Sequence, residues 1–270
     1  MITQTTLGIN GLLGNQMFQY AAMRGIAHAN NLEYGLHRHN RTTTTSLGVH
    51  VEQVLYDAFQ IHGPFVDVEL PVLDLEDGRL PYNKQIMFRC PDNVDLIGFF
   101  QSPLYFKNIE EQIRQDFTFR PEITDGVRVN PRAIALHVRR ADYMKLFHLY
   151  TLVQMDYYTN ALKHFDPAQP VIIFSDDTEW CKAQPEFQGK RFTVSEETNS
   201  AKDLYKMSQC SDFIICNSTY SWWGAWLGTN PNKKVVAPTL WFHPSSNIPD
   251  TDLIPDNWLR IKNSALGPLG

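Results

Sequence analysis

The sequence predicts an α/β protein with parallel β-strands. Two observations lead to this class. Beyond Pro131, short apolar runs alternate with stretches of helical periodicity, and such alternation is typical of βαβ units with right-handed crossovers. In addition, polar residues gather directly after several apolar runs, where open α/β sheets bind their ligands.

The first elements of the chain are predicted from weak alternation and from glycines. Residues 5–9 predict a first strand. Residues 11–15 form a glycine loop, and the apolar residues between 17 and 26 recur at helical spacing. Residues 40–93 are rich in Pro, Gly and His, which predicts irregular structure with short helices over 51–60.

The next elements are a strand and a capped helix. The apolar run 94–100 predicts a buried strand. Ser102 and Pro103 suit the N-cap and the first turn of a helix across 104–117.

After Pro131 the alternation is regular, with polar turns between the elements. The predicted strands are 133–138, 171–175, 191–194, 212–216 and 234–237, and the predicted helices are 156–165, 177–184, 200–209 and 219–229.

A chain of 270 residues is long enough for two domains. The polar, turn-rich stretch 121–131 is the candidate boundary. We therefore expect an N-terminal lobe of residues 1–125 and a C-terminal lobe of residues 126–270.

Composition and charge exclude several classes. The net charge of −5 gives no electrostatic support for binding nucleic acid. The four cysteines form no CxxC pair and no zinc-site spacing. We find no secretory signal and no apolar run long enough to span a membrane. We expect a cytoplasmic protein, with peripheral membrane association as a compatible location.

The segment after Phe213-Ile214-Ile215 predicts a strand, a polar turn and a helix N-terminus. Asn217, Ser218, Thr219 and Ser221 supply side-chain donors there, and the helix supplies free N–H groups with a partial positive charge. The turn suits an anion. The alternative is an ordinary N-cap on a core helix.

A second polar cluster follows the predicted strand 133–138, and it consists of His137, Arg139, Arg140 and Asp142. Adjacent arginines at a strand end are costly unless they pair with an anion or a carboxylate, and the guanidinium fork suits phosphate. The alternative is a solvated arginine pair held by Asp142. Together the two strand ends favour a phosphate-bearing ligand.

Acidic residues follow one strand and precede another: Asp176 and Asp177 come after Phe174-Ser175, and Asp212 lies just before the strand 213–216. Asp176 and Asp177 could hold a divalent metal on a nucleotide diphosphate, but a cap at Ser175 or Asp176, with Asp177 in the first turn, is the favoured interpretation. Asp212 could pair with one of the arginines or accept hydrogen bonds from a base.

The N-terminal glycine loop does not match the dinucleotide-binding fingerprint. Gly11 and Gly14 lack its spacing, which argues against an NAD site. Asn15 and Gln16 then serve either as helix caps or as amide donors to a ligand.

Three tryptophans follow the polar turn, at Trp222, Trp223 and Trp226. They could form a platform for a sugar ring. Large aromatic residues on a crossover helix mostly belong to the core, so we favour packing against the sheet.

Taken together, these segments resemble the α-1,2-fucosyltransferases, glycosyltransferase family 11. The HxRRxD motif and the NSxxSWWGAW motif are highly specific, and the others are weaker. The matching segments span nearly the whole chain and are Gly14-Asn15-Gln16-Met17-Phe18-Gln19-Tyr20-Ala21, His137-Val138-Arg139-Arg140-Ala141-Asp142-Tyr143, Phe174-Ser175-Asp176-Asp177, Asn217-Ser218-Thr219-Tyr220-Ser221-Trp222-Trp223-Gly224-Ala225-Trp226 and Ile254-Pro255-Asp256-Asn257-Trp258.

The resemblance implies a GT-B fold of two Rossmann-like lobes, with the donor site in the cleft. It implies metal-independent, inverting transfer of fucose from GDP-β-L-fucose to the 2-hydroxyl of a galactose-terminated acceptor, without a further cofactor. It also implies that Arg139 or Arg140 contacts the β-phosphate, that Ser218-Thr219 binds the phosphates, and that an acidic residue placed like Asp212 or Asp177 binds guanine. Asp142 and His137 are the nearby candidates for a general base.

Two kinds of alternative stay open. One is a fucosyltransferase of another linkage or a transferase for another GDP-sugar. The other is a carbohydrate-binding module, suggested by the six Trp and eleven Tyr residues. Such modules are usually β-rich, which the predicted alternation disfavours.

Overall fold

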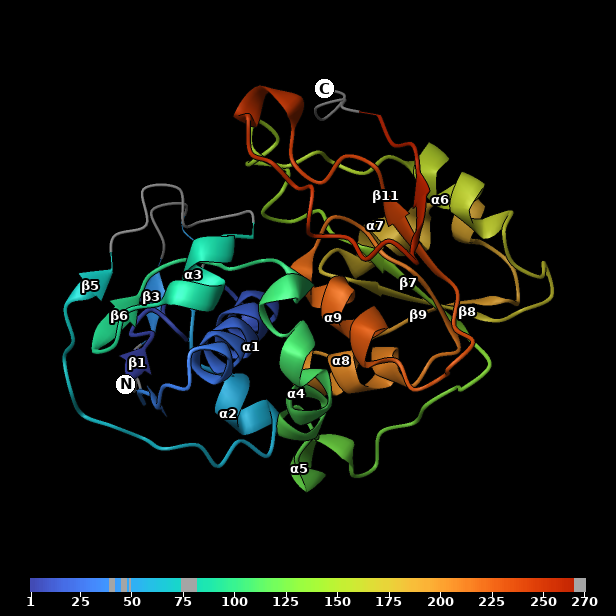
Figure 1. Ribbon diagram of the computed structural model, residues 1–270. Helices are drawn as coiled ribbons and strands as arrows, with labels where there is room; N and C mark the ends of the chain where they lie inside the picture. The colour runs from blue at the N-terminus through green and yellow to red at the C-terminus, as the bar shows by residue number, and fades with distance from the viewer. Residues whose placement is uncertain (39–41, 45–47, 49, 74–81, 265–270) are drawn as a thin grey trace. The chain divides into compact units, whose positions relative to one another are not determined.

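The chain folds into two compact units in the computed structural model, which describes residues 1–38, 42–44, 48, 50–73 and 82–264 (Figure 1). Unit 1 comprises Met1–Glu122 and Pro249–Pro255. Unit 2 comprises Ile123–Ile248 and the segment from Asp256 onward.

The segment Pro249–Pro255 departs from the expected division, which assigned it to the C-terminal lobe. It belongs to unit 1, where Asp252 makes two hydrogen bonds with residues of that unit. Its carboxylate accepts a hydrogen bond from the N–H of Tyr82 at 3.2 Å, and its carbonyl accepts one from the hydroxyl of Ser102 at 3.3 Å.

Unit 1 is built on a parallel sheet with the strand order β2-β1-β6-β5. Helix α1 (Leu13–Ala29) connects β1 to β2 and buries Met17, Phe18 and Ile26. The strands are β1 Ile2–Thr3, β2 Tyr34–Gly35, β5 Val72–Leu73 and β6 Val94–Leu96.

The prediction of a first strand at residues 5–9 is wrong. The first strand is β1, and residues 5–9 form turns. The N–H and the hydroxyl of Thr5 donate to the carboxylate of Asp95, at 2.9 and 2.6 Å, so the backbone leaves the sheet there. Gly8 then adopts a φ of +90°, which interrupts any extended run.

The helix predicted across 104–117 is divided into three pieces. Ser102 caps the first piece as expected, because its side chain accepts a hydrogen bond from the N–H of Leu104. Phe106 and Ile109 interrupt the helix with φ values of −129° and −134°. The pieces are η1 Pro103–Tyr105, η2 Lys107–Ile109 and α4 Glu110–Asp116.

The remaining elements of unit 1 are short. A short helix was expected within 51–60, and helix α2 confirms it. The elements are the antiparallel pair β3 Thr43–Thr44 and β4 His50–Val51, with helices α2 Leu55–Ala58 and α3 Lys84–Arg89. Helix α5 (Pro121–Thr124) lies at the division between the units.

Unit 2 contains a six-stranded parallel sheet with the strand order β12-β11-β10-β7-β8-β9. Its strands are β7 Ile134–Val138, β8 Val171–Ser175, β9 Phe192–Val194, β10 Asp212–Ile214, β11 Val235–Pro238 and β12 Leu259–Ile261. Its helices are α6 Met155–Leu162, α7 Thr178–Ala183, α8 Ser200–Ser208 and α9 Thr219–Leu227, with the 3₁₀ turns η3 Pro185–Phe187 and η4 Pro244–Ser246.

The predicted alternation of strands and helices in unit 2 is confirmed, with small shifts at the ends of the elements. Strand β12 was not predicted, and it is a partly exposed edge strand. An edge strand buries little apolar surface and therefore leaves a weak sequence pattern.

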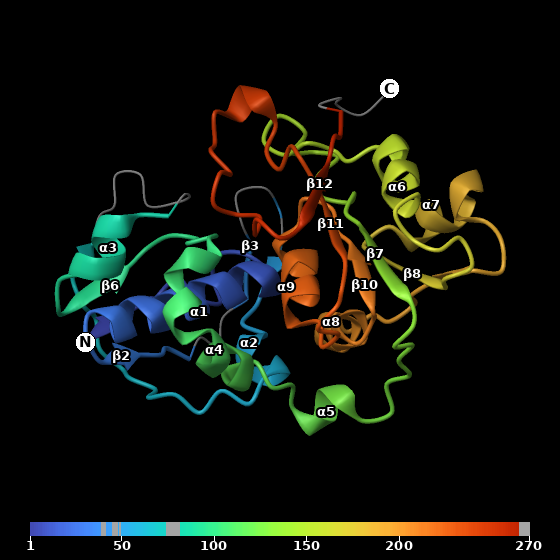
Figure 2. The same ribbon diagram turned by 45° about the vertical axis from the view of Figure 1, so that its right-hand side comes forward.

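Helices cover both faces of the unit 2 sheet (Figure 2). On one face, Tyr157 of α6 and Cys181 of α7 join a core with Leu136 of β7. On the other face, α8 and α9 approach so closely that a Cβ on Gly224 would lie 2.3 Å from Sδ of Met207. The helices thus cover the two faces of the sheet, and the turns that connect strands to helices line its carboxyl edge.

Candidate functional site

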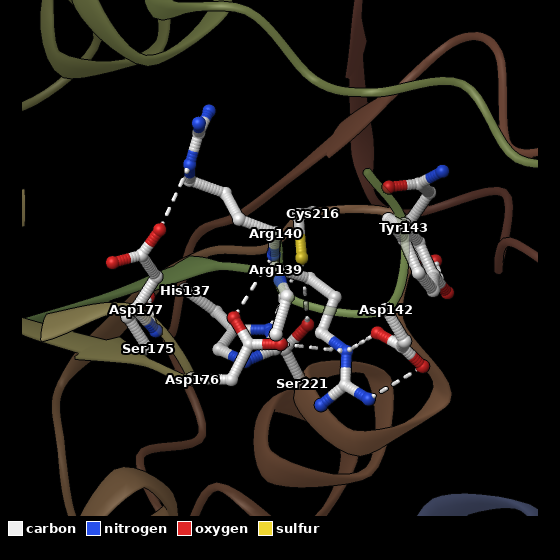
Figure 3. A network of polar contacts seen from close by, with 12 residues as sticks. His137, Arg139, Arg140, Asp142, Tyr143, Ser175, Asp176, Asp177, Cys216 and Ser221 are labelled. Carbon is white, nitrogen blue, oxygen red and sulfur yellow. Dashed lines mark hydrogen bonds and ion pairs between the residues drawn. The ribbon is translucent and has the colours of Figure 1, made fainter. Parts of the chain in front are cut away.

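Three polar turns meet at the carboxyl edge of the unit 2 sheet, because β10, β7 and β8 are neighbours there (Figure 3). In the parallel register, Val138 pairs with Ser175, and Leu136 pairs with Ile214. The residues that follow these strands, which include the arginines, the aspartates and the turn before α9, therefore lie side by side.

Two carboxylates hold Arg139. Asp142 binds it bidentately, with Nε–Oδ1 at 2.8 Å and Nη2–Oδ2 at 2.9 Å. Asp176 lies 3.1 Å from Nε. Burial alone would lower the pKa of Arg139, but the hydrogen bonds that it donates to Asp142 and the charge of Asp176 raise it above its usual value. Arg139 is thus a fixed cation.

Asp176 holds the main chain of the arginine turn as well. Its two carboxylate oxygens accept hydrogen bonds from the N–H groups of Arg140, at 2.9 Å, and Ala141, at 3.2 Å. Burial raises the pKa of Asp176, while Arg139 and the N–H of Arg140 oppose that rise. The contacts of Asp176 with the protein make it a support for the arginine turn.

Arg140 points away from Arg139 in Figure 3. Its Nε lies 3.3 Å from Asp177, and its guanidinium stacks over the ring of Trp180, 4.0 Å from the centroid. Asp177 is itself the N-cap of α7, since its side chain accepts a hydrogen bond from the N–H of Trp180. The favoured cap interpretation is therefore right in kind, but the cap is Asp177 and neither Ser175 nor Asp176.

His137 is buried, with 4 % of its surface exposed. Its Nδ1 lies 3.1 Å from Sγ of Cys216, and its ring packs against Tyr220. Burial, together with the charge of Arg139, lowers the pKa of His137 to about 3. The residue is neutral and enclosed between the strand ends. This position suits a residue that supports the site better than one that exchanges a proton with a substrate.

The turn before α9 lies next to Arg139 (Figure 3). Ser218 is the N-cap residue, and its side chain makes no capping hydrogen bond to the helix. Thr219 begins the helix and is partly exposed. A helix of nine residues whose cap side chain does not close its first turn can direct main-chain N–H groups at an anion.

Asn217 and Ser221 were predicted to bind the donor, and the structure assigns both to internal contacts. The amide of Asn217 donates to the carbonyls of Thr151 and Trp241, each at 2.7 Å. The hydroxyl of Ser221 donates back to the carbonyl of Ser218 at 3.2 Å. Both side chains are almost fully buried, so they shape the turn.

The prediction that Asp212 pairs with the arginines is wrong. Asp212 begins β10, so it lies at the amino end of that strand, opposite the edge that carries the arginine turn. It accepts hydrogen bonds from Gln169 at 2.7 Å, from Ser211 at 2.8 Å and from the N–H of Lys234 at 2.9 Å. The sequence already placed Asp212 at the start of this strand, and in a parallel sheet that end lies away from the arginine turn.

Asn15 and Gln16 lie at the start of α1 in unit 1. Gln16 is fully buried; its amide N–H groups donate to the carbonyls of Gly11 and Glu52, and its oxygen accepts from Val54 and Leu55. The prediction that Gln16 offers donors to a ligand is therefore wrong. Oδ1 of Asn15 accepts a hydrogen bond from Gln101 at 2.9 Å.

A further acidic residue lies at the carboxyl edge and was not among the predicted site residues. Asp203, in the first turn of α8, accepts a hydrogen bond from Ser195 at 2.6 Å. Lys206 donates to the same serine hydroxyl at 3.1 Å. Burial raises the pKa of Asp203 to about 6. The sequence could have indicated this residue, because Ser195 directly follows β9 and Asp203 lies early in the next helix.

Two absences apply to the part of the chain that the structure describes. Within it, no group of three or more His, Cys, Asp or Glu side chains is arranged to hold a metal ion. Nor does any helix within it have the length and apolar character needed to cross a membrane.

The family model described as Glycosyl transferase family 11 matches residues 1–262. The chain belongs to this family. The resemblance stated from the motifs is confirmed, and the protein is a glycosyltransferase. This excludes the alternative of a non-enzymatic carbohydrate-binding module.

Curated relatives match nearly the whole chain. An alpha-1,2-colitosyltransferase of Escherichia coli is 27 % identical over 294 residues, covering 93 % of this chain and 97 % of the relative. The galactoside alpha-(1,2)-fucosyltransferase 1 of Homo sapiens is 24 % identical over 291 residues, covering 96 % of this chain and 75 % of the relative.

A solved structure matches the fold. The apo form of POFUT1 aligns with a TM-score of 0.50 and 12 % identity, covering 87 % of this chain and 97 % of that chain. With the parallel sheets of both units, this match confirms the expected GT-B-type α/β class.

Proposed function

We propose that this family 11 enzyme transfers L-fucose from GDP-β-L-fucose to the 2-hydroxyl of a terminal β-galactoside, with inversion and without a metal ion. One observation carries the donor half of the proposal. Arg139 is fixed by Asp142 and Asp176 beside the start of α9. A fixed cation and a helix N-terminus together suit the negative charge of a diphosphate.

The chemistry of the transfer explains why this pair is useful. As the bond between sugar and phosphate breaks, negative charge develops on the departing β-phosphate. Arg139 and the N–H groups at the start of α9 would stabilise that charge without moving, because both are already held in place. The proposal assigns the supporting role to Asp142, since both of its oxygens bind Arg139.

The carboxyl edge also offers an acceptor for the guanine base. A carboxylate pairs well with the N1–H and the 2-amino group of guanine. Asp177 caps α7 and pairs with Arg140, and Asp212 lies at the far end of β10. Asp203 remains, a partly buried carboxylate at this edge that accepts a hydrogen bond from Ser195. We therefore assign guanine recognition to Asp203.

Inosine diphosphate tests this assignment, because its base lacks the 2-amino group. The wild-type protein should bind GDP more tightly than inosine diphosphate. An Asp203→Asn variant should lose most of that preference while keeping its melting temperature. An unchanged preference in the variant would remove Asp203 from the base site.

The proposal also names the sugar that the enzyme transfers, L-fucose. Relatives of this chain are named for fucose and for colitose. The deciding experiment supplies GDP-fucose, GDP-colitose and GDP-mannose in turn, with a panel of β-galactosides. The proposal expects transfer from GDP-fucose and a product with an α-1,2 linkage. Preferred transfer from another donor, or another linkage, would refute it.

A further inference from the structure

Tyr143 links the arginine turn to the turn before α9. It follows Asp142 directly and is 8 % exposed. Its hydroxyl donates a hydrogen bond to the main-chain carbonyl of Asn217 at 2.9 Å. Asn217 immediately precedes Ser218, the N-cap residue of α9. One side chain thus connects two segments that the proposed donor site requires together.

The ring of Tyr143 is held independently of its hydroxyl. It stacks on Tyr150 with centroids 4.4 Å apart and planes inclined by 7°. The guanidinium carbon of Arg139 lies 5.8 Å from the centroid of the Tyr143 ring. The aromatic stack therefore fixes where the hydroxyl points, and the hydroxyl reaches the turn before α9.

The other contacts at this turn hold different atoms. Cys216 packs against His137, one residue before Asn217. The side-chain amide of Asn217 binds the carbonyls of Thr151 and Trp241. The hydrogen bond from Tyr143 is made instead to the main-chain carbonyl of Asn217, next to the N-cap. Without it, the peptide between Asn217 and Ser218 would be held only through its N–H, which donates to the carbonyl of Cys216 at 2.8 Å, and the first N–H groups of α9 would be less firmly directed.

We propose that Tyr143 is a positioning residue for the transfer reaction. Its hydroxyl sets the start of α9 relative to Arg139, so that both act on the same leaving diphosphate. This rests on the proposed function. The effect should be larger in the transition state than in the bound donor, because charge on the β-phosphate grows as the sugar leaves.

The test replaces Tyr143 by phenylalanine, which keeps the stacked ring and removes only the hydroxyl. Tyr158→Phe is the matched control. Tyr158 is fully buried, and among the described residues its hydroxyl has no hydrogen-bond partner. Steady-state kinetics with GDP-fucose, GDP titration, thermal melting and hydrogen–deuterium exchange across 217–221 are measured on both variants, with the kinetics well below every Tm.

The expected result separates the two variants. Tyr143→Phe should lower kcat about tenfold, the scale of one lost hydrogen bond, and change KM for the donor by less than about twofold. Its amides across 217–221 should exchange faster than those of the wild type. Tyr158→Phe should match the wild type in kcat and in exchange.

Two outcomes would overturn the proposal. One is a Tyr143→Phe variant with kcat within about twofold of the wild type. The other is unchanged exchange across 217–221, which would show that the hydroxyl does not hold the turn. Failure of the proposed function has a different signature: the wild type itself would neither bind GDP nor transfer from a GDP-sugar. The exchange measurement would still decide whether Tyr143 holds the turn.

Discussion

Nε of Arg139 lies 3.1 Å from a carboxylate oxygen of Asp176. The two residues follow different strands, β7 and β8, which are neighbours in the unit 2 sheet. The same carboxylate accepts the N–H groups of Arg140 and Ala141. Asp176 therefore fixes both the side chain of Arg139 and the main chain that follows it, which prepares the guanidinium for an anion before any ligand arrives.

The first prediction concerns the two arginines. Arg139→Lys should lower kcat by about 100- to 1,000-fold, because lysine cannot replace a guanidinium that binds its carboxylates and a phosphate at once. Arg140→Lys should lower it far less, since Arg140 is paired with Asp177 and stacked on Trp180. Kinetics of both variants with GDP-fucose provide the measurement.

The ranking of the two variants is the informative result. If Arg140→Lys were the more damaging change, the phosphate contact would belong to Arg140. If both variants kept nearly full kcat, neither arginine would touch the phosphates.

The second prediction concerns metal ions. Asp176 and Asp177 both accept hydrogen bonds from the protein, and Arg139 with the start of α9 would neutralise the diphosphate. Activity should therefore be unchanged in EDTA. The measurement is the initial rate after chelation and after adding Mn²⁺ or Mg²⁺. Loss on chelation and recovery with either ion would favour a metal held by the aspartates.

The third prediction concerns Trp226, which is 7 % exposed and packs 5.1 Å from the ring of Trp223, centroid to centroid. Trp226→Ala should reduce the free energy of unfolding by about 3–5 kcal/mol. The folded fraction should bind GDP normally. Phe88→Ala, at a side chain 55 % exposed, is the control and should change stability little. A Trp226→Ala variant that melts normally but no longer binds GDP would show that the ring contacts the ligand.

The fourth prediction is a pH dependence of stability at His137. Its pKa is lowered to about 3 by burial and by Arg139, whereas an unfolded histidine has a pKa of about 6.5. Between these values the unfolded chain binds a proton that the folded chain does not. The contribution to stability is therefore complete above about pH 6.5 and is lost as the pH falls toward 3.

His137→Asn removes this titration and keeps a hydrogen-bond acceptor for Cys216. Urea unfolding of both proteins from pH 4 to pH 7 gives the measurement, and the difference between them isolates His137 from groups such as Asp203. The variant should lose less stability than the wild type on acidification. Parallel curves would show that His137 titrates normally in the folded protein.

Local pattern was sufficient for much of the fold. The apolar run of β8, from Val171 to Ser175, was predicted with both ends correct, since a fully buried strand leaves a continuous apolar signal. Local pattern failed at residues 5–9, because the hydrogen bonds that end the strand are donated by Thr5 to the carboxylate of Asp95, far along the chain. It also failed at 104–117, where non-helical residues divide the predicted helix.

The sequence by itself determined the family, the α/β class and the strand ends that carry charged residues, because periodicity and motifs are properties of neighbouring residues. Only the tertiary structure decided the role of each side chain. Asp212 and Asp176 are both aspartates near a strand end, yet one lies at the amino end of its strand and the other supports Arg139. The sequence indicates the end of the strand at which each residue lies, but only long-range packing decides which strands are adjacent, and the adjacency of β7 and β8 brings Asp176 to Arg139.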